Sequence, residues 1–105
     1  MMNSWPGVFY TQDMVKDMLN QDNPVLLGEA ILALYSQQTT TEQLCKTTSE
    51  SNNRGFSYKT VRTGTYIATW LLGDANRRIS GKFIPKAKSI CWIHNKQITN
   101  LLNNR

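Results

Sequence analysis

Two large aromatic side chains lie one helical turn apart in a stretch that contains bases and no acid. Tyr66 and Trp70 are four residues apart, and Lys59 and Arg62 precede them. When side chains are placed at about 100° per residue, these four fall on one side of a helix, opposite a stripe of small and aliphatic residues. A solvated face of this kind usually carries Glu, Lys and Gln, so two aromatic rings beside two bases indicate a binding surface.

A second aromatic residue between bases occurs near the end of the chain. Lys88, Trp92 and Lys96 are spaced at i, i+4 and i+8, which predicts a straight row along one helix face. Lys82 and Lys86 fall beside this row, again away from the predicted core stripe.

The combined chemistry is that of a nucleic-acid-binding surface. Lysine and arginine neutralise phosphates, and an exposed aromatic ring stacks on an unpaired base. The predicted contact residues are Lys59, Arg62, Tyr66, Trp70, Arg77, Arg78, Lys82, Lys86, Lys88, Trp92 and Lys96.

Two other interpretations of the aromatic residues remain open at this point. Tyr66 and Trp70 could be core residues that pack under an N-terminal arm, residues 1–10, which contains Trp5, Phe9 and Tyr10. The same face could instead dock a protein, because aromatic residues and arginine also dominate protein interfaces.

The charge distribution favours a polyanionic partner for the second half of the chain. The 105 residues carry a net charge of +5, but residues 1–45 sum to −4 and residues 46–105 sum to +9. Such asymmetry is typical of a domain that faces nucleic acid with one side. A soluble domain that happens to be basic gives the same net charge, so charge alone does not decide.

Residues for catalysis or metal binding are sparse. Cys91 and His94 lie three apart and provide two ligands, whereas a closed zinc site needs four, so we expect no metal and no cofactor. The chain has no phosphate-binding glycine motif. We therefore expect no enzymatic activity. Cys45 and Cys91 could pair, although buried thiols are commoner in cytoplasmic proteins.

Hydrophobic periodicity predicts an all-α fold: a compact bundle of about four helices in one small domain. A short helix over 12–20 follows the cap residue Thr11, and a helix over 25–38 follows Asn23 and Pro24. The second helix is apolar around most of its circumference, which predicts a buried central helix. Residues 39–48 either continue it or form a separate turn, and residues 49–55 form a loop.

Two further helices carry the predicted surface. One spans 58–72, with Ser57 as its N-cap and Gly73 beyond its end. Its predicted core stripe is Val61, Gly64, Ala68, Leu71 and Leu72. The last helix runs from Ser80 to about residue 102, with Pro85 in or just after its first turn.

From about residue 33 onward, the order of residues resembles a known module. The first group of matching residues is Leu34, Tyr35, Gln38, Thr39, Glu42 and Gln43. The second group is Asn53, Gly55, Phe56 and Ser57, and the third is Ser80, Lys82, Ala87, Lys88 and Gln97. Together they resemble a small helical module of phage, plasmid and bacterial DNA-processing proteins, some of them helicase-like.

The resemblance implies an auxiliary role beside nucleic-acid enzymes, in a mobile element, and no reaction. The chain departs from the pattern at 58–60, where the module has an acidic residue, and at Phe83 and Pro85. Gly55, Phe56 and Ser57 also have a structural explanation: a free backbone, a core residue and a helix cap.

These observations predict a non-catalytic nucleic-acid-binding protein that prefers single-stranded or branched DNA to a specific duplex site. The alternative is a protein-interaction module that modulates a replication or host-defence enzyme, with the acidic N-terminal third as its contact surface. We expect a cytoplasmic location with no membrane association, because the first ten residues lack the pattern of a secretory signal and the apolar runs are short.

Overall fold

The computed structural model describes residues 2–37, 56, 57, 59–73 and 78–105, and 68% of these residues are helical. They form five α-helices and one 3-10 turn, with no strand among them. The radius of gyration, 12.6 Å, is that of a compact chain of this length. The predictions for 39–48, 49–55 and Arg77 lie outside the described residues, as do Gln38, Thr39, Glu42, Gln43, Asn53 and Gly55 of the resemblance.

Helix α1 (Gln12–Leu19) begins at the predicted cap residue. The Thr11 side chain accepts a hydrogen bond from the Met14 backbone N–H at 3.2 Å. Val15 and Leu19 face the core and are fully buried. The helix ends one residue before the predicted limit of 20, and Asp22 then turns the chain with a φ of 54°.

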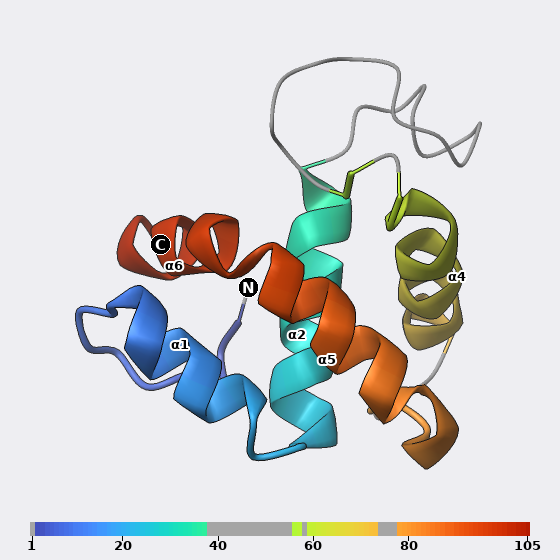
Figure 1. Cartoon of the computed structure of the whole chain (residues 1–105), viewed down its shortest axis with the longest axis horizontal. Helices are drawn as coiled ribbons and strands as arrows, with labels where there is room; N and C mark the ends of the chain where they lie inside the picture. Colours follow the sequence, from blue (N-terminus) through green and yellow to red (C-terminus); the bar gives the residue numbers. More distant parts are fainter. Residues whose placement is uncertain (1, 38–55, 58, 74–77) are drawn as a thin grey trace.

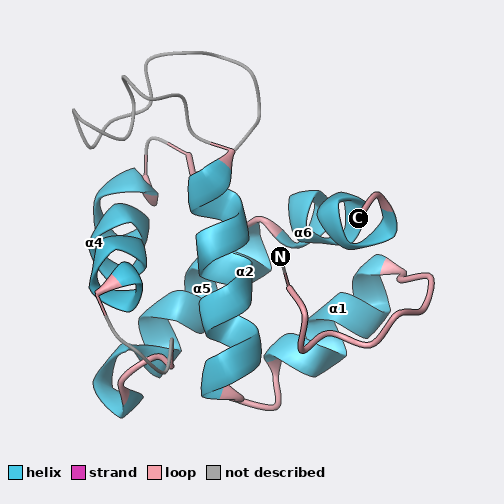
Figure 2. Cartoon of the chain, turned by 180° about the vertical axis from the view of Figure 1, so that it is seen from behind, coloured by secondary structure: helices cyan, strands magenta, loops and turns pink. Residues whose placement is uncertain are grey.

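Helix α2 (Pro24–Ser36) also begins as predicted, because the Asn23 side chain accepts hydrogen bonds from the backbone N–H groups of Val25 and Leu26. Figures 1 and 2 show α2 with the other helices arranged around it, and it packs against α1, α4, α5 and α6. Its buried residues are Leu26, Leu27, Gly28, Ala30, Ile31, Ala33 and Leu34. Seven of the thirteen residues of α2 are therefore buried.

The aromatic residues of the N-terminal arm belong to the core. Trp5 and Tyr10 are 2% and 1% exposed, and their rings meet edge to face with centroids 5.9 Å apart. The Trp5 indole N–H donates to the Leu26 carbonyl at 3.2 Å, which ties the arm to α2. Tyr66 and Trp70 take no such place in the core, so the interpretation that they pack under this arm is wrong.

Helix α4 (Val61–Leu72) begins three residues later than predicted. Ser57 does not cap it directly. Instead the Ser57 carbonyl accepts from the N–H groups of Thr60 and Val61, and the Thr60 hydroxyl accepts from the Ser57 N–H at 2.9 Å. This small turn, and not a side-chain cap, leads into the helix.

The buried stripe of α4 differs from the prediction at three positions. Val61, Gly64, Ala68 and Leu71 are buried as expected, and Thr65 and Ile67 join them. Leu72 is 49% exposed, because it occupies the last position of the helix. A helical wheel gives the direction of a side chain but not how far the neighbouring helix extends.

The close approach of α4 to Phe56 depends on Gly64. A Cβ atom at position 64 would lie 2.5, 2.6 and 2.7 Å from three carbon atoms of the Phe56 ring. Phe56 is 1% exposed, so the ring has little room to move. The absence of a side chain at Gly64 therefore allows Phe56 to pack against the helix that carries the predicted surface.

The predicted helix over 80–102 is divided. A 3-10 turn, η1 (Gly81–Phe83), leads into α5 (Ile84–Ile93), and α6 (Asn95–Asn103) follows after His94, whose φ and ψ are −100° and 22°. Helix α6 runs in a different direction from α5 (Figure 1). The described residues thus form five α-helices and not about four, and His94 is the reason, because it leaves the helical conformation.

None of the helices that the structure describes is long and apolar enough to cross a bilayer.

Candidate nucleic-acid interface

The outward face of α4 carries the first predicted group of residues. Tyr66 is 53% exposed and Trp70 is 42% exposed, one turn apart, and Lys59 and Arg62 are exposed beside the start of the helix. Packing of the opposite stripe against α2 determines this orientation. Helix α4 has no acidic residue, so no carboxylate of its own neutralises these bases.

The 3-10 turn η1 extends this face. The Tyr66 and Phe83 rings lie 5.6 Å apart between centroids, tilted by 59°. The Lys82 ammonium lies over the Phe83 ring at 5.2 Å from its centroid, within the range of a cation–π contact. Phe83 therefore links a base on η1 to an aromatic ring on α4.

We call this combined region the α4–η1 surface. Its members are Lys59, Arg62, Tyr66, Trp70, Lys82 and Phe83. Phe83 was missed by the sequence reasoning, because its place beside Tyr66 is a contact between two elements that the pattern of the predicted helix over 80–102 does not contain. The one signal in the sequence that Phe83 could belong to a binding surface was its position between two bases, one residue after Lys82 and three before Lys86.

The second predicted group is not one continuous row. Lys88 forms an ion pair with Asp22, with Nζ and Oδ1 2.9 Å apart. Trp92 is 38% exposed, and the Lys16 ammonium lies 5.5 Å from the centroid of its ring. Lys96 is exposed but belongs to α6, beyond the change of direction at His94. Lys88 and Trp92 thus already have partners within the chain, namely the carboxylate of Asp22 and the ammonium of Lys16.

The remaining predicted bases are distributed around these two groups. Lys86 is exposed in the first turn of α5, one turn after Lys82. Arg78 is exposed, in the segment that enters η1. Arg77 lies outside the described residues.

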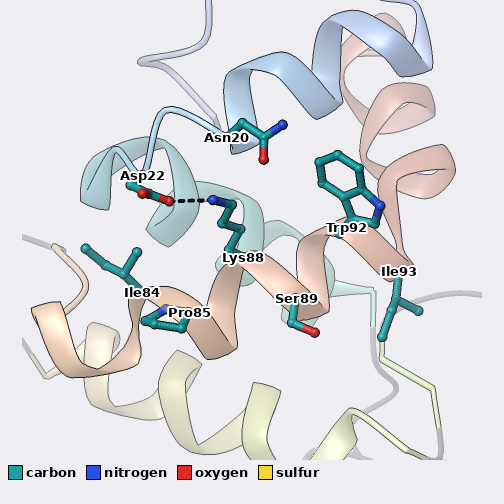
Figure 3. Close-up of a pocket in the computed structure, with 8 residues that line it drawn as sticks. All are labelled: Asn20, Asp22, Ile84, Pro85, Lys88, Ser89, Trp92 and Ile93. Atoms are coloured by element: carbon teal, nitrogen blue, oxygen red, sulfur yellow. Dashed lines mark hydrogen bonds and ion pairs between the residues drawn. The ribbon is translucent and has the colours of Figure 1, made fainter.

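A groove runs along the outer side of α5. It has a volume of about 510 Å³, between α5 and the turn that joins α1 to α2 (Figure 3). Its lining residues are Asn20, Asp22, Ile84, Pro85, Lys88, Ser89, Trp92 and Ile93. The Asp22–Lys88 ion pair links the turn to α5 across the groove, and Trp92 and Ile93 lie further along α5, at the other end of the groove (Figure 3).

His94 connects the break between α5 and α6 to the turn before α4. Its Nε2 atom lies 3.0 Å from the Thr60 hydroxyl and accepts from the Ser57 N–H at 3.4 Å. Because a backbone N–H only donates, Nε2 is the acceptor and the ring is neutral. Burial lowers the pKa of His94 below its ordinary value of 6.5. This geometry describes a structural histidine.

The chemistry for catalysis remains sparse in the described part of the chain. Cys91 is a free thiol and fully buried, and this burial raises its pKa well above the usual range, so the reactive thiolate is disfavoured. No cluster of three or more His, Cys, Asp or Glu residues with metal-binding geometry occurs among the described residues. What the described side chains of the α4–η1 surface provide is positive charge, aromatic rings and hydrogen-bond donors.

Comparisons with known proteins give no family for this chain: no family model matches it, and neither a curated protein nor a solved structure is significantly similar to it.

Proposed function

We propose that this protein binds nucleic acid without catalysis, through the α4–η1 surface, and that it prefers single-stranded or branched DNA. The observation that carries this proposal is the pair of rings, Tyr66 and Trp70, half-exposed on a helix that also carries Arg62 and has no acid. Exposing two large aromatic rings to water costs free energy that a partner with flat apolar faces recovers.

Phosphates and bases have separate contacts on this surface. Lys59, Arg62, Lys82 and, one turn further, Lys86 provide up to four cations for the phosphate backbone. The exposed rings stack on bases, and such stacking contributes about 1–3 kcal/mol per base. With four phosphate contacts on a single strand, raising the salt from 50 to 200 mM weakens binding by roughly fiftyfold.

A single strand fits this surface better than a duplex. Stacking on Trp70 or Tyr66 needs the face of a base, and in a duplex the neighbouring base pairs cover both faces. Sequence-specific reading of a duplex needs a helix whose polar side chains reach base edges in the major groove. The outward face of α4 instead carries rings.

The second predicted group contributes less. Lys16 covers one face of Trp92, and Asp22 neutralises Lys88. Of the eleven predicted contact residues, we therefore keep those of the α4–η1 surface and Lys86. In the same proposal, α2 is the buried central helix of the bundle that supports this surface. An auxiliary role beside nucleic-acid enzymes, which the sequence resemblance implies, is part of the same proposal.

The alternative function, a protein-interaction module, also has an observation in its favour. Val8 and Phe9 of the N-terminal arm are 52% and 78% exposed, next to the acidic residues of α1. An exposed phenylalanine beside acids is typical of a protein contact and not of a polyanion site.

A comparison of two tryptophan variants tests the proposed function. Fluorescence anisotropy with a labelled twelve-nucleotide oligothymidylate measures affinity for Trp70→Ala and for the matched control Trp92→Ala. We expect Trp70→Ala to lose about tenfold or more in affinity, since one stacking contact disappears. Trp92→Ala should lose less than about threefold, because Lys16 already covers its ring.

Three results would overturn the proposal. One is an equal effect of the two variants. Another is tighter binding of a duplex of the same length. The third is a salt dependence close to zero, since phosphate contacts release counterions. Circular dichroism of both variants confirms that the helices persist.

A further inference from the structure

The N-terminal arm is held in place at both of its ends. The Asn103 side chain accepts from the Tyr10 N–H at 2.8 Å and donates to the Tyr10 carbonyl at 2.9 Å. The Arg105 guanidinium donates to the carbonyls of Met2 and Pro6. Together with buried Trp5 and Tyr10, these bonds fix a short loop between two anchored points.

The loop presents an apolar side chain to solvent. Phe9 is 78% exposed and Val8 is 52% exposed, although the residues on either side of the loop are buried in the core. Because the backbone is already held, a partner that covers Phe9 does not have to order a flexible segment. Such a preorganised ring has the properties of an interface anchor.

Acidic residues follow this loop directly. Asp13 and Asp17 are exposed one turn apart on α1 and form no ion pair with any other described residue. The base between them, Lys16, directs its ammonium to Trp92. The loop and the start of α1 therefore form an apolar knob with a negative border.

The groove along α5 has the complementary properties. Ile84, Pro85 and Ile93 give it apolar walls, and Ile93 is 61% exposed. Its volume of about 510 Å³ is in the range of pockets that bind small molecules, about 300–1,000 Å³, so it accommodates one aromatic side chain. Lys88 pairs with Asp22 in its lining, and Lys16 lies over the ring of Trp92, so these three charged groups leave a net charge of about +1 at the groove.

The knob cannot reach the groove of its own chain. Phe9 precedes the N-terminus of α1, whereas the groove begins at Asn20 and Asp22, beyond its C-terminus. The eight residues of α1 span about 12 Å between them, and the hydrogen bonds of Asn103 and Arg105 hold the arm in place.

We infer that the groove along α5 binds the Phe9 loop of a second copy of this chain, in a head-to-tail contact. The knob and the groove are different surfaces, so a dimer still has one free knob and one free groove, and the association is open-ended. If the proposed function also holds, copies bound side by side on one strand bind cooperatively, and this consequence alone depends on that function.

Sedimentation velocity on the free protein, without nucleic acid, tests the contact. One aromatic side chain and a few charges give a Kd on the order of 100 µM, so we measure from about 10 to 500 µM protein. We expect concentration-dependent growth beyond a dimer, weaker at high salt. Phe9→Ser should weaken association by about tenfold or more, because it removes the anchor.

A second variant blocks the groove and makes the test specific. Ser89 is exposed in the groove, and Ser89→Glu places a longer, negative side chain against the acids of the incoming copy. Each variant alone should associate at least about tenfold more weakly than the parent chain, but a mixture of the two should form mainly one-to-one dimers with an affinity close to that of the parent contact. The mixture retains one intact knob and one intact groove, and only a head-to-tail contact restores association in this way.

The controls separate this inference from the proposed function. Trp70→Ala should self-associate like the parent chain, and Phe9→Ser should bind a short oligonucleotide like the parent chain. A parent chain that is monomeric at about 500 µM would overturn the inference. A mixture that stays monomeric, or self-association unchanged by Phe9→Ser, would do so as well. None of these outcomes affects the test of Trp70.

Discussion

Replacing Gly64 by alanine tests how α4 is held in place. Alanine is the better helix former, so the sequence alone predicts a gain of about 1 kcal/mol in the free energy of unfolding. The structure predicts a loss. The new Cβ would lie 2.5–2.7 Å from three atoms of the Phe56 ring, nearly 1 Å closer than ordinary contact.

The magnitude follows from the lack of space around that ring. Phe56 is 1% exposed, so neither the ring nor α4 moves away without disturbing the packing against α2. Inserting a methylene into a filled core costs about 1–3 kcal/mol, and contact with three ring atoms places Gly64→Ala at the upper end. After subtraction of the gain in helix propensity, the net loss is about 1–2 kcal/mol. In a domain of this size, the melting temperature falls by roughly 5–10 °C.

Thermal and urea unfolding of Gly64→Ala measure this loss, and Gly73→Ala is the control. A Cβ at Gly73 would have its nearest neighbours at 3.6 and 3.9 Å, and the φ of −86° suits alanine, so its stability should change by less than about 0.5 kcal/mol. Adding Phe56→Leu to Gly64→Ala should recover about 1 kcal/mol beyond additivity. A stabilised Gly64→Ala variant, or strictly additive effects, would refute the reasoning.

Two other predictions concern contacts that hold the ends of the chain and of α4. Burial lowers the pKa of His94, so the unfolded chain takes up a proton at a higher pH than the folded chain does. The contribution of His94 to the free energy of unfolding is therefore complete above about pH 6.5, its pKa in the unfolded chain, and is lost as the pH falls through its pKa in the folded chain. His94→Gln keeps an acceptor and should flatten this loss in urea unfolding at pH 7.5 and 5, whereas an unchanged pH profile would contradict the assignment. Asn103→Ala removes two hydrogen bonds to Tyr10 and should cost about 1–2 kcal/mol with faster amide exchange in residues 2–10. The exposed control Asn100→Ala should change neither quantity, and slow exchange in Asn103→Ala would show that the arm is held otherwise.

Local signals in the sequence predicted the start of two helices correctly. Thr11 and Asn23 cap α1 and α2, because a polar side chain satisfies backbone N–H groups within a few residues of itself. The starting point of α4 was wrong, since the side chain of Thr60 and the ring of His94 both bond to the Ser57 region. His94 is far away in the sequence, so no local pattern contains that information.

The direction of the aromatic side chains on α4 was predictable, but their neighbours were not. Periodicity places Tyr66 and Trp70 opposite the apolar stripe, and they are exposed. The contact of Tyr66 with Phe83 and that of Lys16 with Trp92 are long-range, and they depend on how α4, η1 and α1 pack. The straight row of Lys88, Trp92 and Lys96 assumed one continuous helix, which the conformation of His94 interrupts.

Amide chemical shifts test the central proposal, binding of a single strand to the α4–η1 surface, most directly. In a titration of ¹⁵N-labelled protein with unlabelled oligothymidylate, we expect the largest shifts at Arg62, Tyr66, Trp70 and Phe83, with a shift of the Trp70 indole N–H. The amides of α6 should change little, because α6 and α4 lie on opposite sides of α2 in both views (Figures 1 and 2). Shifts confined to α6 or to the N-terminal arm, or no shifts at saturating oligonucleotide, would contradict the account.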